Sequence, residues 1–194
     1  MEQARAVRLA DGRLHLHHGP IDIVADAEGP GHDAAFARAA DRFGPVLAAL
    51  AAELPELRKP AATAAPSGSI ARAMVAATTP FTAEFVTPMA AVAGAVADAI
   101  CAALAGPGVT RCYANNGGDI AIRLTPGERF VAAIAAPVPA SVTLTHDLPA
   151  RGVATSGWRG RSHSLGIADS VTVLAATAAV ADAAATLIAN AVDL

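Results

Sequence analysis

Apolar and polar residues alternate along the first thirty positions of the chain. In residues 4–29, ARAVRLADGRLHLHHGPIDIVADAEG, the alternation has a period of two and is interrupted at Asp-Gly and Gly-Pro. This pattern predicts three short strands in an antiparallel meander. From Asp33 to about Leu54 the apolar spacing becomes helical, and Gly44-Pro45 should kink or split this helix.

The middle of the chain consists mainly of small and apolar residues. Residues 60–69, PAATAAPSGS, carry no charge, so they predict a connecting loop and the candidate boundary between two lobes. We interpret residues 70–81, IARAMVAATTPF, as a strand. Thr87 and Pro88 suit the N-cap and the first turn of a helix that ends near Ala105, where Gly-Pro-Gly follows.

Short strand-like segments dominate the second half of the chain. They are expected at residues 109–113, 119–124, 129–136 and 170–175. Residues 137–168 are expected to be irregular apart from a short strand at Val142–Thr145. Thr177 can cap a last helix that reaches about Val192. Antiparallel sheets with packed helices predict an α+β fold, with residues 1–194 as a single domain.

The composition indicates a globular protein and excludes some functional classes. The chain has 194 residues, of which 54% are hydrophobic and 16% charged, so it can bury a large core. Aromatic residues make up 4%, so Ala and Val should fill the core and let backbones approach closely. The net charge is −3 and no basic run occurs, so nucleic-acid binding is not expected. The absence of a signal-peptide pattern or membrane span predicts a cytoplasmic protein in which Cys101 and Cys112 are free thiols.

The last predicted helix carries one polar stripe. Asp182, Thr186 and Asn190 are four residues apart among Ala, Val, Leu and Ile, so they share a face. A carboxylate followed one turn later by a hydroxyl is an oxygen pair of the kind that binds Mg²⁺. The alternative is a narrow solvated stripe, and for this helix alone that interpretation is the simpler one.

Two glycine-containing segments could approach a ligand. In YANNGGDIAI, residues 116–118 suit a hairpin turn, and Asp119 directly after them could meet a metal or a ligand hydroxyl. In residues 152–170, backbone N–H groups and arginines could bind phosphate, and His163 could act as an acid or a base. A flexible surface loop is the alternative for this second segment.

Two further polar features need an explanation. His15 and His17 share a strand face and could bind a transition metal, but no third ligand is evident, so an exposed face is the favoured interpretation. Asp98 is the lone charge on a helix predicted to be buried, and a buried carboxylate needs a partner or a function. Gly94, one turn earlier, would let another backbone approach.

Three motifs occur in a familiar order: NNGGDIAI, then GVATSG with RSHSLGIADSVTVLA, then ADAAATLIANAV. Together with IARAM and PMAAVAGAVAD they resemble the ApbE-like superfamily, whose best-known members are the FAD:protein FMN transferases, and most closely its short branch. The likeness covers about Ile70 to Val192 well and the N-terminal third loosely. It implies a two-lobed ApbE-like fold with a pocket for a flavin nucleotide, FAD or FMN, and Mg²⁺ as a cofactor.

The resemblance also implies roles for individual residues. The side chains of Asp182 and Thr186 and the backbone carbonyl of Ala154 would bind Mg²⁺. The nucleotide would lie against two loops, at Asn116, Gly117, Gly118, Asp119, Thr155, Ser156 and Gly157. His163 and Asp119 are the expected catalytic residues, which would handle the proton in phosphoryl or FMN transfer.

The chain departs from the transferase pattern at one informative place. The Lys-Gly pair expected at the start of the second helix reads Ala93-Gly94 here, and the flavin-contacting segment near the N-terminus of the transferases is not found. Two hypotheses follow: a Mg²⁺-dependent transferase acting on a flavin nucleotide, and a protein that binds a nucleotide or anionic metabolite unchanged. The weakly charged, Ala-rich helices also suggest a homodimer.

Overall fold

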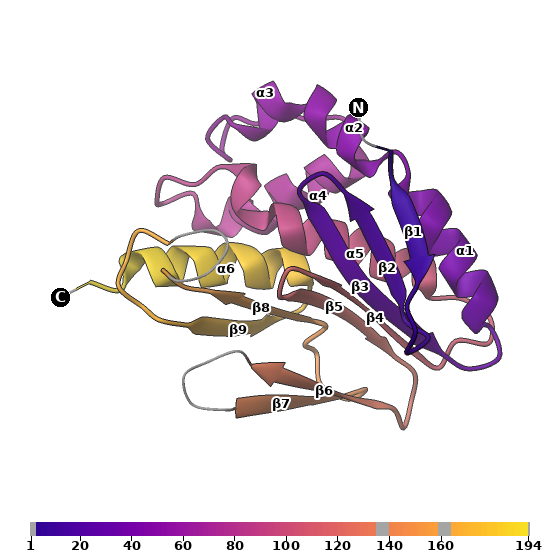
Figure 1. Ribbon diagram of the computed structural model, residues 1–194. Coiled ribbons are helices and arrows are strands. Elements are labelled where there is room, and N and C mark those ends of the chain that lie inside the picture. Colours follow the sequence, from indigo (N-terminus) through magenta and orange to yellow (C-terminus); the bar gives the residue numbers. More distant parts are fainter. Residues whose placement is uncertain (1–2, 135–139, 159–163, 194) are drawn as a thin grey trace.

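Seven antiparallel strands form one sheet, and the main helices lie on one face of it (Figure 1). The computed structural model describes residues 3–134, 140–158 and 164–193. In spatial order the strands are β1 (Arg5–Arg8), β2 (Leu14–His18), β3 (Ile21–Glu28), β4 (Arg111–Asn116), β5 (Asp119–Leu124), β8 (Gly152–Ser156) and β9 (Val171–Ala175). A separate two-stranded sheet contains β6 (Arg129–Ile134) and β7 (Ala140–Thr145). The predicted α+β fold is confirmed.

The N-terminal meander forms as the period-two pattern predicts. On β2 and β3 every second side chain is buried, starting with Leu14 and Ile21, while the residues between them are partly exposed. The turn between the two strands contains Gly19, whose φ of 57° is the left-handed conformation that glycine adopts readily. A shift of one residue would expose the apolar face, so burial fixes the register of this hairpin.

The helices that follow the meander are shorter than their patterns suggest. They are α1 (His32–Phe43), α2 (Val46–Ala52), α3 (Leu54–Leu57) and α4 (Ser69–Thr78), followed by the 3₁₀ turn η1 (Thr79–Phe81). The predicted split at Gly44-Pro45 is confirmed, since α1 ends before it and α2 begins after it. Residues 60–68 contain no helix or strand, as expected for a connecting loop.

The strand predicted at residues 70–81 is wrong, because this segment forms α4 and η1. Its buried positions, which include Ile70, Met74 and Ala77, recur at helical spacing. Alanine and methionine favour a helix, and together they outnumber the β-branched residues in this segment. The strand β8 shows the opposite error, because its residues were expected to be irregular.

The second long helix begins with the 3₁₀ turn η2 (Pro88–Ala91), continues as α5 (Val92–Leu104) and lies beside the last helix, α6 (Ala178–Ala191). Thr87 does not cap this helix through its side chain, contrary to the prediction. Thr177 does cap α6, since its hydroxyl accepts a hydrogen bond from the Val180 N–H at 3.2 Å. Among the described residues, no helix is long and apolar enough to cross a membrane.

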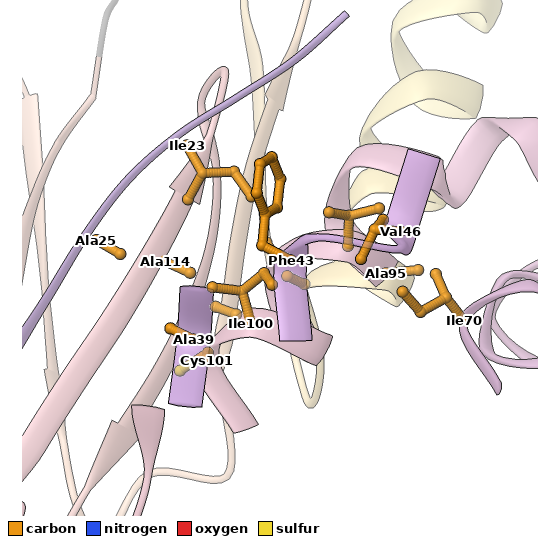
Figure 2. Packing of buried hydrophobic residues seen from close by; sticks show 14 of the residues in the cluster. Ile23, Ala25, Ala39, Phe43, Val46, Ile70, Ala95, Ile100, Cys101 and Ala114 are labelled. Atoms are coloured by element: carbon orange, nitrogen blue, oxygen red, sulfur yellow. The ribbon is translucent and has the colours of Figure 1, made fainter. Parts of the chain in front are cut away.

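Small residues let the core pack tightly between helices and sheet, as the composition predicts. Figure 2 shows Phe43 and Val46 beside Ile23 of the sheet and Ile100 of α5, with alanines filling the spaces around them. A Cβ atom added to Gly94 would lie 2.2 Å from the carbonyl oxygen of Ala178. The backbones of α5 and α6 therefore touch at this glycine, as its position in the sequence suggested.

The two helices also cap each other. Asp98 of α5 accepts hydrogen bonds from the N–H groups of Ala178 and Ala179 at 3.0 and 2.9 Å, at the start of α6. Asp182 of α6 accepts a hydrogen bond from the Gly94 N–H at 2.9 Å, near the start of α5. Each carboxylate lies where the partial positive charge of a helix N-terminus favours it. This arrangement supplies the partner that a buried Asp98 requires.

Candidate functional site

A cavity of about 560 Å³ opens where the β4–β5 hairpin meets α2, α3 and α5. Its polar side contains Asn116, Gly117, Asp119 and Thr155. The opposite wall is apolar and is formed by Pro20, Ile21, Leu47, Leu50, Ala51, Leu54, Leu57, Met89, Val92 and Val96. A pocket that is mostly apolar with a few convergent polar groups is the usual form of a small-molecule site.

The polar rim of this cavity is a two-residue hairpin turn. Gly117 and Gly118 have φ angles of 69° and 116°, and Asn116 pairs with Asp119 across the turn. The Gly118 N–H donates to Oδ1 of Asn115 at 2.8 Å. The sequence NNGGD is therefore a hairpin turn, and it also lies at the edge of a cavity.

Asn116 connects the hairpin to the start of α5. Its side chain is 8% exposed, and its Nδ2 donates to the carbonyl oxygen of Ala93 at 3.0 Å. Ala93 is the residue that the resemblance aligns with the lysine of the transferases' Lys-Gly pair. In this chain that position contributes a backbone carbonyl to the rim, and no ammonium group.

Asp119 is a half-buried carboxyl group that is surrounded largely by protein and has an unusual proton affinity. Burial and the neighbouring charge of Asp182 raise its pKa to about 8, although a hydrogen bond from the Thr155 N–H favours the ionised form. None of the groups that perturb this pKa is a cation. Near neutral pH, Asp119 therefore keeps its proton for most of the time.

Asp182 is the second member of this acidic pair. Burial raises its pKa to about 6, and hydrogen bonds from the N–H groups of Gly94 and Ala93 oppose that increase. Two carboxyl groups that cannot both ionise easily are a common arrangement in active sites. A divalent cation bound between them would allow both to ionise.

The remaining residues of the expected metal site lie near this pair. Thr186 follows Asp182 by one turn of α6 and is partly exposed. Ala154 is buried on β8, where it pairs with Val173 of β9 and packs against α6. The pairing of β8 with β5 ends at Val153, so the backbone beyond it passes Asp119 without joining that strand.

The fit to Mg²⁺ rests on this set of oxygen donors. Two half-buried carboxyl groups, a hydroxyl one helical turn from Asp182 and the nearby β8 backbone are hard oxygen ligands of the kind that Mg²⁺ prefers. The raised pKa values of Asp119 and Asp182 are consistent with negative charge that only backbone N–H groups offset. The residues therefore suit the cation that the resemblance implies.

The other residues of the expected phosphate loop have mainly structural contacts. The hydroxyls of Thr155 and Thr172 lie 2.9 Å apart between β8 and β9, and Ser156 is 7% exposed. A Cβ atom on Gly157 would lie 2.3 Å from the carbonyl oxygen of Asp169, so tight packing requires this glycine. Only Thr155 of this loop contributes to the cavity lining.

Two polar residues on the last helix make hydrogen bonds to different parts of the structure. Asp182 faces the start of α5, whereas Asn190 accepts a hydrogen bond from the Leu165 N–H at 2.8 Å and so holds the loop before β9. His163, the other expected catalytic residue, lies outside the described residues, as do Arg159 and Arg161.

The histidine prediction needs a correction. A third candidate ligand does exist, because Asp22 of β3 lies beside the two histidines, with its Oδ1 2.7 Å from Nε2 of His15. The strand pairing that brings β3 next to β2 is not visible in a single-strand pattern. The cysteines are free, as predicted, and the Sγ atoms of Cys101 and Cys112 lie 3.9 Å apart in the core.

Sequence reasoning missed the apolar wall of the cavity. Leu47, Leu50 and Leu54 belong to α2 and α3, which were expected only to continue the first helix. The signal in the sequence was PVLAALAAELPEL, which is too apolar for a short surface helix.

Comparison with known proteins places this chain in a family. The family model described as AbpE bacteria matches residues 5–194. The chain is similar to a UPF0280 protein of Methanospirillum hungatei, with 41% identity over 110 residues that cover 54% of this chain and 45% of that protein. A UPF0280 protein of Methanopyrus kandleri is 39% identical over 123 residues, which cover 62% of this chain and 48% of the relative.

A UPF0280 protein of Methanothermobacter thermautotrophicus gives a similar result, with 42% identity over 110 residues, 54% of this chain and 42% of the relative. The matched region thus spans about half the length of these curated relatives. Because the family model matches nearly the whole chain, the chain belongs to the ApbE-like family described as AbpE bacteria.

Proposed function

We propose that the protein binds a flavin nucleotide, FAD or FMN, through Mg²⁺ bound by Asp182, Thr186 and the carbonyl of Ala154. The observation that supports this most strongly is the pair of half-buried carboxyl groups, of which Asp119 lines a mostly apolar cavity and Asp182 is its neighbour. Buried acidic groups without a cationic partner are costly unless they bind a cation or a proton.

The cavity has the two chemical surfaces that such a ligand requires. The leucines of α2 and α3 can cover a planar ring system, because they offer an extended apolar wall. The opposite rim, at Gly117 and Asp119, can receive the phosphates. When bound, Mg²⁺ would supply positive charge to the phosphate oxygens and so stabilise charge that develops on a leaving phosphate.

Asp119 is the described residue best suited to hold a proton at this rim. Its pKa is about 8 in the metal-free protein, and Mg²⁺ bound beside it would lower that pKa, so the carboxylate could accept a proton during transfer. His163 is the second candidate by resemblance. Phosphoryl or FMN transfer is the reaction that these roles fit.

A second function is binding without turnover. Ala93 supports it, because its side chain carries neither charge nor hydrogen-bonding group where the transferases have a lysine. In that case the site would hold a nucleotide or another anionic metabolite unchanged. The expected cytoplasmic location and homodimer are predictions for either function.

Calorimetric titration of FAD into the purified protein, with and without Mg²⁺, tests the proposal. We expect FAD to bind at least tenfold more tightly with Mg²⁺, and Asp182→Asn to lose this dependence. Asparagine keeps the volume and one acceptor oxygen at the start of α5, so folding should survive. Asp147→Asn is the matched control, because the Asp147 side chain is 96% exposed.

Chromatography of the recovered nucleotide then separates the two functions. Release of FMN or AMP indicates a transferase, whereas unchanged FAD after long incubation with Mg²⁺ indicates a binding protein. Absence of FAD and FMN binding under both conditions would remove flavin nucleotides as ligands. The same Mg²⁺ dependence in Asp182→Asn as in the wild type would contradict the metal assignment.

A further inference from the structure

We propose that His15, His17 and Asp22 form a second metal site, specific for a Zn²⁺-type transition metal, on the outer face of the sheet. One ligand atom from each residue lies within 4.8 Å of the other two. Within the described part of the chain, no other group of three or more His, Cys, Asp or Glu side chains converges in this way.

The register of the β2–β3 hairpin produces this convergence. His15 and His17 are two residues apart on β2, so their side chains leave the same face, and their ring centroids are 6.2 Å apart. Asp22 lies directly opposite His17 on β3, and its Oδ1 is 2.7 Å from Nε2 of His15. Burial of the alternate side chains fixes this register, so the three ligands cannot drift apart along the strands.

The ligand types select the metal. Two imidazoles and one carboxylate are a set that Zn²⁺ accepts, with bonds of about 2.0–2.2 Å and a fourth position for water. Mg²⁺ prefers oxygen ligands, so it should bind here weakly. Tetrahedral zinc requires donors about 3.4 Å from one another, so metal binding would replace the contact between His15 Nε2 and Asp22 Oδ1, which are 2.7 Å apart, with bonds to the ion.

The surroundings leave this site open to ions from solvent. The His15 and Asp22 side chains are 33% and 43% exposed. The neighbouring strand β1 is exposed along its length and places Arg5 opposite His17 and Val7 opposite His15. The guanidinium of Arg5 is the nearest cation by register, and its exposed position lets it remain in water when a metal binds.

This site is independent of the cavity. Ile21 is buried and lines the cavity, whereas the next residue, Asp22, points to the other face of β3. Zinc binding therefore requires neither the acidic pair nor a nucleotide. It would join β2 to β3 at the outer surface of the same hairpin that forms part of the cavity wall.

Titration of tag-free, chelator-treated protein with Co²⁺, followed by visible absorption, tests the assignment, and calorimetry with Zn²⁺ gives the affinity. We expect one equivalent to bind with a dissociation constant in the micromolar range or below. His17→Gln and Asp22→Asn should each weaken binding at least tenfold. His146→Gln, which changes a histidine on an element far along the chain, should bind like the wild type.

Four results would overturn the proposal. Three are the absence of binding with up to 1 mM metal, unchanged affinity in both variants, and a near-ultraviolet thiolate band that indicates Cys101 or Cys112 as a ligand. The fourth is displacement of Zn²⁺ by a moderate excess of Mg²⁺, which would place the ion at the acidic pair instead. Thermal unfolding of each metal-free variant serves as the folding control, and the two variants supply independent tests.

Discussion

The two ends of the α5–α6 contact each contain a half-buried aspartate, and the two aspartates have different partners. At one end, Asp98 gives one carboxylate oxygen to each of two N–H groups of α6. At the other end, Asp182 accepts from the start of α5 but lies beside a second carboxyl group, Asp119. Burial raises the pKa of both Asp98 and Asp182. The comparison indicates that Asp98 is satisfied within the fold, whereas the acidic pair requires a proton or a cation.

The largest expected effect is a loss of stability when the close contact between α5 and α6 at Gly94 is disrupted. Gly94→Ala would place a Cβ atom 2.2 Å from the Ala178 carbonyl oxygen, so the helices must separate. We expect a loss of about 3 kcal/mol or more in the free energy of unfolding, measured by urea denaturation. Gly44→Ala is the control, because Gly44 has a helical φ and room for a methyl group. Equal stability of the two variants would contradict the close contact.

Asp98→Ala should destabilise the protein by about 2 kcal/mol, because two buried N–H groups of α6 lose their acceptor. Asp98→Asn should cost less, since its amide oxygen can still accept one hydrogen bond. Urea denaturation of both variants checks this order. If FAD or Mg²⁺ binding fell as much in Asp98→Asn as in Asp182→Asn, the contrast between the two ends would be wrong.

The smallest expected effect is a pH dependence that comes from the acidic pair. The pKa of Asp119 is about 8 in the folded protein and about 3.9 when unfolded, so the folded state binds a proton that the unfolded state releases. Stability from this residue is therefore present at low pH and declines as the pH rises from about 4 to 8.

Asp119→Asn should remove that decline. The Asp119 side chain is half-exposed, so water that reaches the ionised carboxylate offsets most of the free-energy cost that the full pKa shift would imply. We therefore expect the Tm of the variant at pH 8 to exceed the wild-type value by about 3 °C, the shift that ~1 kcal/mol produces in a domain of this size. At pH 5.5 the two melting temperatures should nearly coincide. Parallel Tm profiles for wild type and variant, measured without metal, would indicate that Asp119 is not buried beside a second charge.

The sequence alone predicted the structural elements that are determined by local residue patterns. The β2–β3 hairpin, the split at Gly44-Pro45, the Gly-Gly turn and the Thr177 cap all depend on residues close together in the chain. Asp98 was flagged correctly because a lone charge on an apolar helix is informative by itself. Its partner at the start of α6, 80 residues away, was not predictable from spacing.

The errors share a physical cause. Residues 70–81 form a helix because alanine and methionine propensities prevail over an ambiguous apolar run. Strand β8 was missed because GVATS combines Val and Thr, which favour strands, with Gly and Ala, which do not, and the strand forms by pairing with β9. Asp22 was not recognised as a neighbour of the histidines because strand register determines that contact.

The short pairing between β5 and β8 should make the sheet open locally at this point more readily than elsewhere. Two residue pairs, Ile120–Val153 and Ala121–Gly152, connect β8 and β9 to the rest of the large sheet. A short ladder opens at lower free energy than a long one, so amide hydrogen exchange should report local opening at this seam. Asp119 lies on one side of it, and α6 with Asp182 packs against β8 on the other. A cation bound by both carboxylates would link the two sides of this seam, so part of its binding free energy would raise the free energy of local opening.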